Sequence, residues 1–398
     1  MENGRITDRK IVIINQAANY LTIGLANAFA NRFAEVVLVT GSIHVQGEIL
    51  NENIKVVYIK KWADRPLLKK AVAYFLGLTQ MYVLLLTRFR KHEVFFVSLP
   101  PMAYLLNIIL PQRFSILIWD VYPDAFKVTG MKEKHSLYRF WARLNKRSFN
   151  KAFRLFTISP KMADLLSQYV DRREIIVRSI WSIFQENGKV PDKDNPFVRQ
   201  HQLEHKFVVQ YSGNIGLAHN AEVMIALAEH LIEEEHITFQ IIGRGLRVPA
   251  LKRKVREKGL QNCQFLAFQS DEMFPSSLSA ADVGVVVLDK MVAKGSVPSK
   301  TYNLMSFGIP GLYIATSDSE LHDYTVKYRH ARCFTEEELQ QAADFILQLS
   351  HNAEMYEVYV RNNLLAAKDY KRSNADKLVE AYIQPDSKLS QTNETVTA

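Results

Sequence analysis

Short apolar runs alternate with helix-like patterns along the chain. In the first half, Ile11–Asn15 is an apolar run, Tyr20–Phe33 has the periodicity of a helix, and Val36–Thr40 is a second run. Continuous β-branched runs between helices are typical of parallel strands covered on both faces. Further strands are predicted at Ile54–Ile59, Val94–Leu99, Ser115–Trp119, Arg154–Ser159 and Ile175–Ile180.

A polar segment, Glu186–Phe197, interrupts this pattern, and its Pro, Asp, Asn and Lys content indicates an interdomain linker. The alternation then resumes. Thr335–Ile383 is predicted to be helical, and the polar tail 385–398 to be disordered. The predicted strands are Phe207–Gly213, Ile237–Gly243, Cys263–Phe268, Val283–Asp289 and Leu312–Ala315, with helices at Ala221–Ile232, Pro249–Lys258 and Phe274–Ala280.

Two such series predict an α/β protein with two doubly wound domains, one over residues 1–185 and one over 186–367. A chain of 398 residues is also too long for one ordinary core. Ligands of doubly wound sheets bind just outside the carboxyl ends of the strands. The loops that follow the strands are therefore where binding residues are expected.

Composition narrows the class of protein. Hydrophobic residues make up 48% of the chain and charged residues 23%, which excludes a disordered protein. Cys263 and Cys333 are far apart, which fits two core residues in a reducing compartment, and the polar start of the chain does not resemble a signal peptide. No His or Cys spacing indicates a metal site, and the acidic pair in Asp192–Asp194 is interpreted as a solvated part of the linker.

Charge is distributed unevenly. Residues 1–185 contain 27 Lys and Arg against 13 Asp and Glu, a net charge of +14, whereas residues 186–398 contain 23 against 28, a net charge of −5. A basic half indicates an anionic partner, either nucleic acid or a membrane surface, although a solvated basic surface explains the charge equally well.

A long apolar segment, Arg65–Lys91, has basic residues at both ends and Gln80 near its middle. It is marginal for a membrane span, which needs about 20 apolar residues. A helix covering the sheet is favoured over an interfacial helix or a span, with part of its surface exposed to lipid. Its cationic ends suit anionic headgroups. A second apolar helix is predicted within Pro100–Phe114.

Three loops of the second half have features of a phosphate site. Tyr211–Gly216 places Gly213 and Gly216 before a helix, which allows backbone amides close to a ligand, although a tight turn explains the glycines equally well. Ile241–Lys254 sets Arg244 and Arg247 beside two glycines, where they pair with a diphosphate or remain solvated. In the third, Val297–Ala315, Ser299 is the expected N-cap and Lys300 lies in the first turn, where the helix dipole disfavours a cation unless it faces an anion.

In the first half, Trp119–Asp124 (WDVYPD) follows a predicted strand. Asp120 is a candidate to act as a base or to orient an acceptor hydroxyl. Asp124 follows a proline and is more simply explained as capping the next turn.

The order of these segments resembles the C-terminal half of a family 4 glycosyltransferase with the GT-B fold. The matching segments are YSGNIG, IIGRG, NCQFLAF, SLSAADVGVVVL, VPSKTYNLMSFGIP and TSDSELHDY. FFVSLPP and WDVYPD resemble the bacterial branch that builds capsule, O-antigen or exopolysaccharide repeats on polyprenyl-diphosphate carriers.

The resemblance implies two Rossmann-like domains facing a central cleft, with the helix 368–384 completing the first. It also implies retaining, metal-independent transfer from a UDP- or GDP-linked sugar to a lipid-linked acceptor, with no cofactor. The protein would then lie in the cytoplasm, peripherally at the inner face of the membrane. Nucleic acid is disfavoured, because the basic residues flank apolar helices without interleaved aromatics.

The chain departs from that family at its two glutamates, which correspond to Gly295 and Asn303, and its basic pair is replaced by Asn214 and His219. An alternative hypothesis is therefore a catalytically lapsed protein that assists another transferase. The residues expected to carry catalysis are Asp120, Arg244 and Lys300, and those expected to bind the donor are Gly213, Asn214, Gly216, Gly243, Phe268, Ser299 and Asn303.

Overall fold

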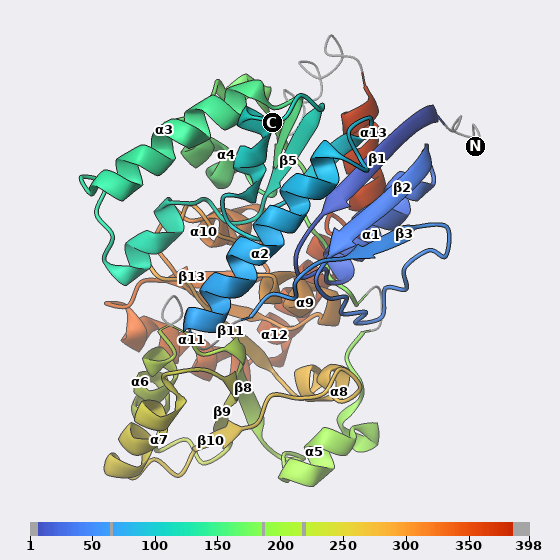
Figure 1. Ribbon diagram of the computed structural model, residues 1–398. Helices are drawn as coiled ribbons and strands as arrows, with labels where there is room; N and C mark the ends of the chain where they lie inside the picture. The colour runs from blue at the N-terminus through green and yellow to red at the C-terminus, as the bar shows by residue number, and fades with distance from the viewer. Residues whose placement is uncertain (1–6, 64–66, 185–187, 217–219, 385–398) are drawn as a thin grey trace. The chain divides into compact units, whose positions relative to one another are not determined.

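The computed structural model describes residues 7–63, 67–184, 188–216 and 220–384 (Figure 1). The chain forms two compact units. The first contains residues up to Phe126, Met131–Ile183 and the segment from Arg372 onward, and the second contains Lys127–Gly130 and Phe184–Lys371. Each unit is built on one parallel sheet, which confirms the predicted α/β class with two Rossmann-like domains.

The sheet of the first unit has seven strands in the order β3-β2-β1-β4-β5-β6-β7. The order reverses between β1 and β4, which is the mark of a doubly wound sheet and positions ligand loops at its carboxyl edge. The strands are β1 (Thr7–Ile14), β2 (Phe33–Thr40), β3 (Lys55–Tyr58), β4 (Glu93–Val97), β5 (Phe114–Ile118), β6 (Arg154–Thr157) and β7 (Ile175–Val177).

The helices of this unit cover both faces of the sheet, as continuous apolar strands require. The predicted helix within Pro100–Phe114 forms as a six-residue 3-10 helix, η1, between the prolines that flank this segment. The elements are α1 (Tyr20–Ala30), α2 (Leu67–Leu86), η1 (Ala103–Ile108), η2 (Asp124–Thr129), α3 (Ser136–Lys151), α4 (Pro160–Leu166), η3 (Arg172–Glu174) and α13 (Asn374–Ile383).

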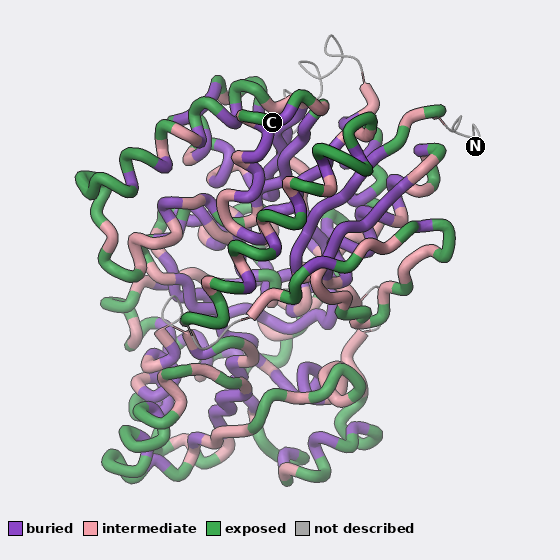
Figure 2. The backbone as a smooth tube through the Cα atoms, viewed as in Figure 1, coloured by how far each residue is buried: buried purple, intermediate pink, exposed green. Residues whose placement is uncertain are grey.

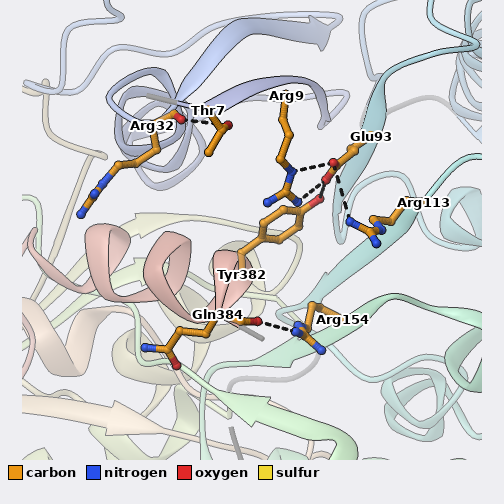
Figure 3. Close-up of polar contacts among 8 residues, drawn as sticks. All are labelled: Thr7, Arg9, Arg32, Glu93, Arg113, Arg154, Tyr382 and Gln384. Carbon is orange, nitrogen blue, oxygen red and sulfur yellow. Dashed lines mark hydrogen bonds and ion pairs between the residues drawn. The ribbon is translucent and has the colours of Figure 1, made fainter. Parts of the chain in front are cut away.

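Helix α13 packs on the first unit by a buried aromatic and ionic anchor (Figure 3). The Tyr382 ring is fully buried, and its hydroxyl donates to the Glu93 carboxylate, which also forms a bidentate pair with Arg9 at 2.6 and 2.7 Å. Burial acts to raise the pKa of Glu93, but the hydrogen bonds from Arg9 and Tyr382 outweigh it and hold the pKa below its ordinary value. Arg154 adds a hydrogen bond to the carbonyl oxygen of Gln384 at 2.7 Å.

Helix α2 covers the sheet with one face and exposes the other. Ala73, Met81 and Leu85 are buried, and the side-chain oxygen of Gln80 accepts a hydrogen bond from the Lys60 amide at 2.7 Å. Among the described residues, no helix has the length and hydropathy that a membrane crossing requires. The opposite, exposed face is visible along α2 in Figure 2 and carries Leu68, Val72, Phe75, Leu76, Val83 and Leu86.

The sheet of the second unit has six parallel strands in the order β10-β9-β8-β11-β12-β13. Its last strand was not predicted, because a four-residue edge strand containing the exposed Arg332 has little apolar signal. The strands are β8 (Phe207–Asn214), β9 (Ile237–Arg244), β10 (Cys263–Leu266), β11 (Val283–Val287), β12 (Gly311–Ile314) and β13 (Ala331–Phe334).

The helices of the second unit pack on this sheet through buried apolar residues such as Leu227, Leu251 and Phe345. The predicted linker contains a 3-10 turn at Asp192–Asp194, whose residues are exposed, and then a short helix at Pro196. The elements are η4 (Asp192–Asp194), α5 (Pro196–His201), α6 (Glu222–His230), α7 (Val248–Glu257), α8 (Phe274–Ser279), α9 (Lys300–Phe307), α10 (Glu320–Tyr328), α11 (Leu339–His351) and α12 (Ala353–Ala367).

Candidate functional site

The two glycine loops of the second unit lie side by side at the carboxyl edge of its sheet. Strands β8 and β9 remain paired to their ends, with Gly213 opposite Gly243 and Asn214 opposite Arg244. The Ile215 amide then donates to the Arg244 carbonyl at 2.9 Å. Two segments that are separate in the sequence therefore form one surface, as the doubly wound fold predicts.

Glycine is required where these loops meet. A Cβ atom on Gly243 would lie 1.9 Å from the carbonyl oxygen of Gly213, and φ is +152° at Gly243 and +147° at Gly213. Neither the space nor the backbone conformation suits another residue. The glycines therefore serve the close approach of two chain segments, whether or not they also serve a ligand.

Lys300, at the start of α9, points its ammonium group at the end of β8. Its Nζ lies 3.9 Å from the centre of the Tyr211 ring and 3.3 Å from the position that a Cβ on Gly213 would take. The Nζ atom is buried and has no hydrogen-bond partner among the described residues. Burial lowers the pKa of Lys300 to about 7. No charged group among the described residues offsets this burial, so Lys300 is a candidate to meet an anionic ligand.

Asn303 lies three residues after Lys300 on the same helix, and both line a small cavity of about 20 Å³. A cavity of this volume is large enough for about one water molecule. The cavity is also lined by Gln210 and Ser212 from β8, which makes its wall polar on the side of the glycine loop. The first turn of α9 thus presents an amide and an ammonium group, with no acidic residue in the turn.

Arg244 ends β9 and extends over the ring of Phe268, with its guanidinium carbon 5.1 Å from the ring centre. Both side chains are exposed, and half of the Phe268 surface is accessible. An arginine over an exposed aromatic ring offers a cation and a flat apolar face together. The structure therefore places Phe268 at the same edge of the sheet as Arg244.

Two predicted features are different in the structure. Arg247, a candidate diphosphate ligand, forms an ion pair with Glu222 at 2.9 Å, and Lys254 contacts the same carboxylate, so the charge of Arg247 is satisfied within the protein. Ser299 occupies the N-cap position, but its backbone is helical and its exposed side chain accepts no capping hydrogen bond. A helical backbone turns the hydroxyl away from the first amides, so the predicted cap interaction is wrong.

The remaining sequence candidates are differently placed. Asn214 is exposed at the end of β8, and its side-chain nitrogen lies 3.1 Å from the position that a Cβ on Gly216 would take. Gly295 is buried in the loop before α9, and its backbone amide donates to the Val292 carbonyl at 2.9 Å. His219 lies outside the described residues.

In the first unit, Asp120 and Asp124 have different environments. Asp120 is exposed just after β5, where the Trp119 amide is held by Ser98 at 2.6 Å. Asp124 is buried and accepts hydrogen bonds from Tyr138 at 2.9 Å and Tyr169 at 3.2 Å. Asp124 thus has a structural role in holding α3 and the turn after α4, whereas Asp120 is exposed.

Tyr211 and Gln210 were not selected from the sequence as site residues. Tyr211 forms the floor under Lys300, and its hydroxyl donates to the Asn214 carbonyl at 2.8 Å. Gln210 is a buried amide that follows three apolar residues of β8, and its side-chain nitrogen donates to the Ser277 carbonyl at 2.8 Å. The signal for Gln210 was present in the sequence, because a polar residue inside a buried strand needs partners.

Comparison with known proteins agrees with this geometry. The family model described as "Glycosyl transferases group 1" matches residues 193–364, which contain the glycine loops, Phe268 and α9. The chain is 28% identical over 258 residues to the probable glycosyltransferase WbjE of Pseudomonas aeruginosa, covering 62% of this chain and 64% of that protein. It is 31% identical over 169 residues to the putative colanic acid biosynthesis glycosyl transferase WcaI of Escherichia coli, covering 42% of this chain and 41% of that protein.

Solved structures show the same fold. HepE of Anabaena in complex with UDP and glucose superposes with a TM-score of 0.71 at 14% identity, covering 94% of this chain and 99% of that one. The sequence matches span less than two thirds of the length of the curated relatives, whereas the fold match spans nearly the whole chain.

Proposed function

We propose that the protein is a glycosyltransferase, because residues 193–364 match the family model described as "Glycosyl transferases group 1". It transfers a sugar from a UDP- or GDP-linked donor to a lipid-linked saccharide in surface polysaccharide synthesis. The observation that carries this proposal is the buried Nζ of Lys300 beside Gly213, which has no hydrogen-bond partner among the described residues. The relative WcaI, named for colanic acid biosynthesis, and the UDP bound by HepE support the choice of substrates.

The main requirement of the transfer reaction is that the protein stabilises the departing nucleoside diphosphate. The bond between the anomeric carbon and the diphosphate oxygen breaks, and its electron pair leaves with the nucleoside diphosphate. Lys300, Arg244 and the backbone amides of the Gly213–Gly216 loop would meet that charge, which makes transfer independent of a metal. One preorganised donor of this kind contributes roughly 2.7–4 kcal/mol in measured oxyanion sites.

The acceptor oxygen forms the new bond to the anomeric carbon, with retention of configuration, and its proton passes to a base. Asp120 is the candidate for this role, or for orienting the acceptor hydroxyl, because it is an exposed carboxylate after β5. It belongs to the first unit, so its role rests on the sequence pattern and its exposure. Asn303, in place of an acidic residue, would contact ribose through its neutral amide.

The test is calorimetric titration of the full chain with UDP and GDP. Lys300→Met removes the charge and keeps the apolar stem, and it should weaken binding by about tenfold or more, as a charge-assisted contact requires. Lys290→Ala removes an exposed cation from the loop before α9 and should leave binding unchanged. Equal affinities in the wild type and both variants would remove α9 from the proposed site.

The loss of both family glutamates favours a second candidate, a lapsed transferase that binds a nucleotide and assists a partner enzyme. Asn303 and Gly295 occupy those positions. The two candidate functions differ in whether the protein turns over a nucleotide sugar. Incubation with nucleotide sugars and a lipid-linked saccharide acceptor should release nucleoside diphosphate if the protein is an enzyme. Tight binding with no release would favour the second candidate.

We also propose that the protein associates peripherally with the inner face of the cytoplasmic membrane through α2. Its exposed apolar face is flanked by Lys69 and Lys70 at one end and by Arg88, Arg90 and Lys91 just beyond the other, all exposed. Each cation near an anionic surface is worth about 1 kcal/mol and is screened by salt.

Flotation with anionic vesicles should show binding that salt weakens and that Phe75→Glu with Leu76→Glu abolishes. Val326→Glu, at an exposed apolar position of the second unit, should leave binding unchanged. Equal binding of the wild type to neutral and anionic vesicles would contradict the electrostatic part.

A further inference from the structure

Three potential metal ligands meet at the amino end of β9, the end opposite Gly243 and Arg244. Glu234 and His236 lie in the turn that precedes β9, and His351 is the last residue of α11. One ligand atom of each lies within 4.8 Å of the others. Because His351 is far from the other two in the sequence, no ligand spacing could reveal this group before the fold was known.

The turn that carries two of these residues is held by its backbone. The Ile237 amide donates to the Glu234 carbonyl at 2.8 Å, and the Phe207 amide donates to the His236 carbonyl at 2.8 Å. The His236 ring lies against the His351 ring, with centres 5.1 Å apart. The fold of the second unit therefore fixes the backbone positions of these three residues.

Hydrogen bonds determine which nitrogen of His236 is available. Ser350 donates its hydroxyl proton to the Leu347 carbonyl at 2.9 Å, so its oxygen can only accept from His236 Nε2, which lies 3.1 Å away. Nε2 therefore carries a hydrogen, and in the neutral ring Nδ1 has a lone pair. A histidine ligand of a metal usually has its second nitrogen oriented in this way by a hydrogen-bond acceptor.

The Nδ1 atom of His236 faces the Glu234 carboxylate, with 3.6 Å between nitrogen and oxygen. A nitrogen and an oxygen at this separation can both be ligands of one ion. Glu233 and Glu235 flank Glu234, and the C-terminal end of α11 carries the negative end of the helix dipole, while the Lys206 ammonium group binds the Glu235 carbonyl oxygen at 2.7 Å.

We propose that Glu234, His236 and His351 bind one divalent zinc ion. Two imidazole nitrogens and a carboxylate oxygen are a common three-ligand set for Zn²⁺, with water as the fourth ligand. Ser350 acts as the positioning residue for His236. The ion would join the turn before β9 to the end of α11 and stabilise the second unit.

This site is separate from the proposed transfer reaction. Strand β9 has eight residues, so its two ends are on the order of 20–25 Å apart at about 3.3 Å per residue. The zinc-site proposal can therefore be tested independently of the glycosyltransferase proposal.

The test uses the untagged full chain, stripped of metal by a chelator and titrated with Zn²⁺ by calorimetry. One ion should bind per chain, and His351→Ala and Glu234→Gln should each weaken binding by at least about tenfold. His230→Ala removes an exposed histidine at the end of α6 and should leave binding unchanged. Zn²⁺ should raise the melting temperature of the wild type and of His230→Ala more than that of His351→Ala, because an ion bound only by the folded state stabilises it.

Ser350→Ala tests the hydrogen-bond argument. Loss of the partner of Nε2 should weaken zinc binding by about 10–100-fold, the usual effect of removing such a partner, while the melting temperature of the metal-free variant changes little. Equal zinc binding by the wild type, His351→Ala and Glu234→Gln would mean an adventitious ion only. That result, or no binding by the wild type, would overturn the proposal.

Discussion

Donor binding should depend on pH through Lys300, because the buried amine is charged for only part of the time in the free protein. Burial lowers its pKa from 10.5 to about 7. Since each pKa unit corresponds to about 1.36 kcal/mol, burial disfavours the charged form by roughly 5 kcal/mol. A bound diphosphate would supply the missing partner and raise the pKa again, so binding should take up a proton above pH 7.

The size of the effect follows from the charged fraction. With a pKa of about 7, the amine is about nine-tenths charged at pH 6 and about one-tenth charged at pH 8. If only the charged form binds the diphosphate well, affinity should fall about tenfold between these two pH values. The Tyr211 phenol packed against the amine stays neutral over this range, because burial raises its pKa.

The assay is calorimetric titration with a nucleotide sugar, whose diphosphate lacks the terminal phosphate ionisation near pH 6. Repeating it in two buffers with different ionisation enthalpies gives the number of protons taken up, which should approach one per ligand at pH 8. Lys300→Met should bind more weakly, with little dependence on pH. Binding by the wild type without proton uptake would refute the argument that the amine is neutralised by burial.

The same pKa makes a prediction about stability that requires no ligand. Because the folded-state pKa of Lys300 is lowered, the unfolded chain binds more protons between about pH 7 and 10.5. The contribution of this residue to stability therefore rises with pH across that window. Lys300→Met should remove this dependence and raise the free energy of unfolding at pH 7 by up to about 4 kcal/mol, as measured by denaturant titration. The variant thus should fold, which makes its binding defect interpretable.

Three further predictions concern residues around the site and the C-terminal helix. Asn303→Glu should raise the pKa of Lys300 by placing a carboxylate on the same helix turn, and calorimetry should then show donor binding with a smaller pH dependence. Gly243→Ala should destabilise the protein by about 1–3 kcal/mol in denaturant titrations and weaken nucleotide binding, because its Cβ would meet the Gly213 carbonyl. Gly259→Ala, at a left-handed φ of +65° with open space around it, should cost only about 1 kcal/mol and leave binding unchanged. Glu93→Gln should destabilise the first unit at pH 7. Arg9 and Tyr382 hold the pKa of Glu93 below its ordinary value, so the free energy of unfolding of the wild type should fall as the pH drops below about 4.5. Glu52→Gln, at an exposed position, should leave the free energy of unfolding unchanged in the same titration.

Much of the fold could be predicted because buried parallel strands leave a strong apolar signal. The runs at Val36–Thr40 and Val283–Asp289 correspond to β2 and β11 with only small shifts at their ends. The edge strand β13 has a weak signal and was missed. The apolar segment after Pro100 has the composition of a helix, and its bounding prolines and short length leave room for a short 3-10 helix.

The candidate site was predictable in its location and less so in its contacts. The carboxyl edge of a doubly wound sheet indicated the loops that contain Gly213, Gly243 and Lys300. Whether a cation at such an edge is available to bind a ligand depends on the side chains around it, and the sequence alone does not show which side chains these are. Arg247 is paired with Glu222 from the neighbouring helix, whereas Lys300 is enclosed by Tyr211 and glycine.

The absence of an acidic residue at Asn303 and the burial of Lys300 explain each other. A glutamate on the first turn of α9 would compensate the ammonium charge and keep it charged at neutral pH. With asparagine there, the cost of a buried charge would be left for the proposed diphosphate ligand to offset, so such a site would gain more from a diphosphate than a precompensated site. Under the proposed function, the asparagine would therefore replace a charged contact to ribose with a stronger dependence on the diphosphate.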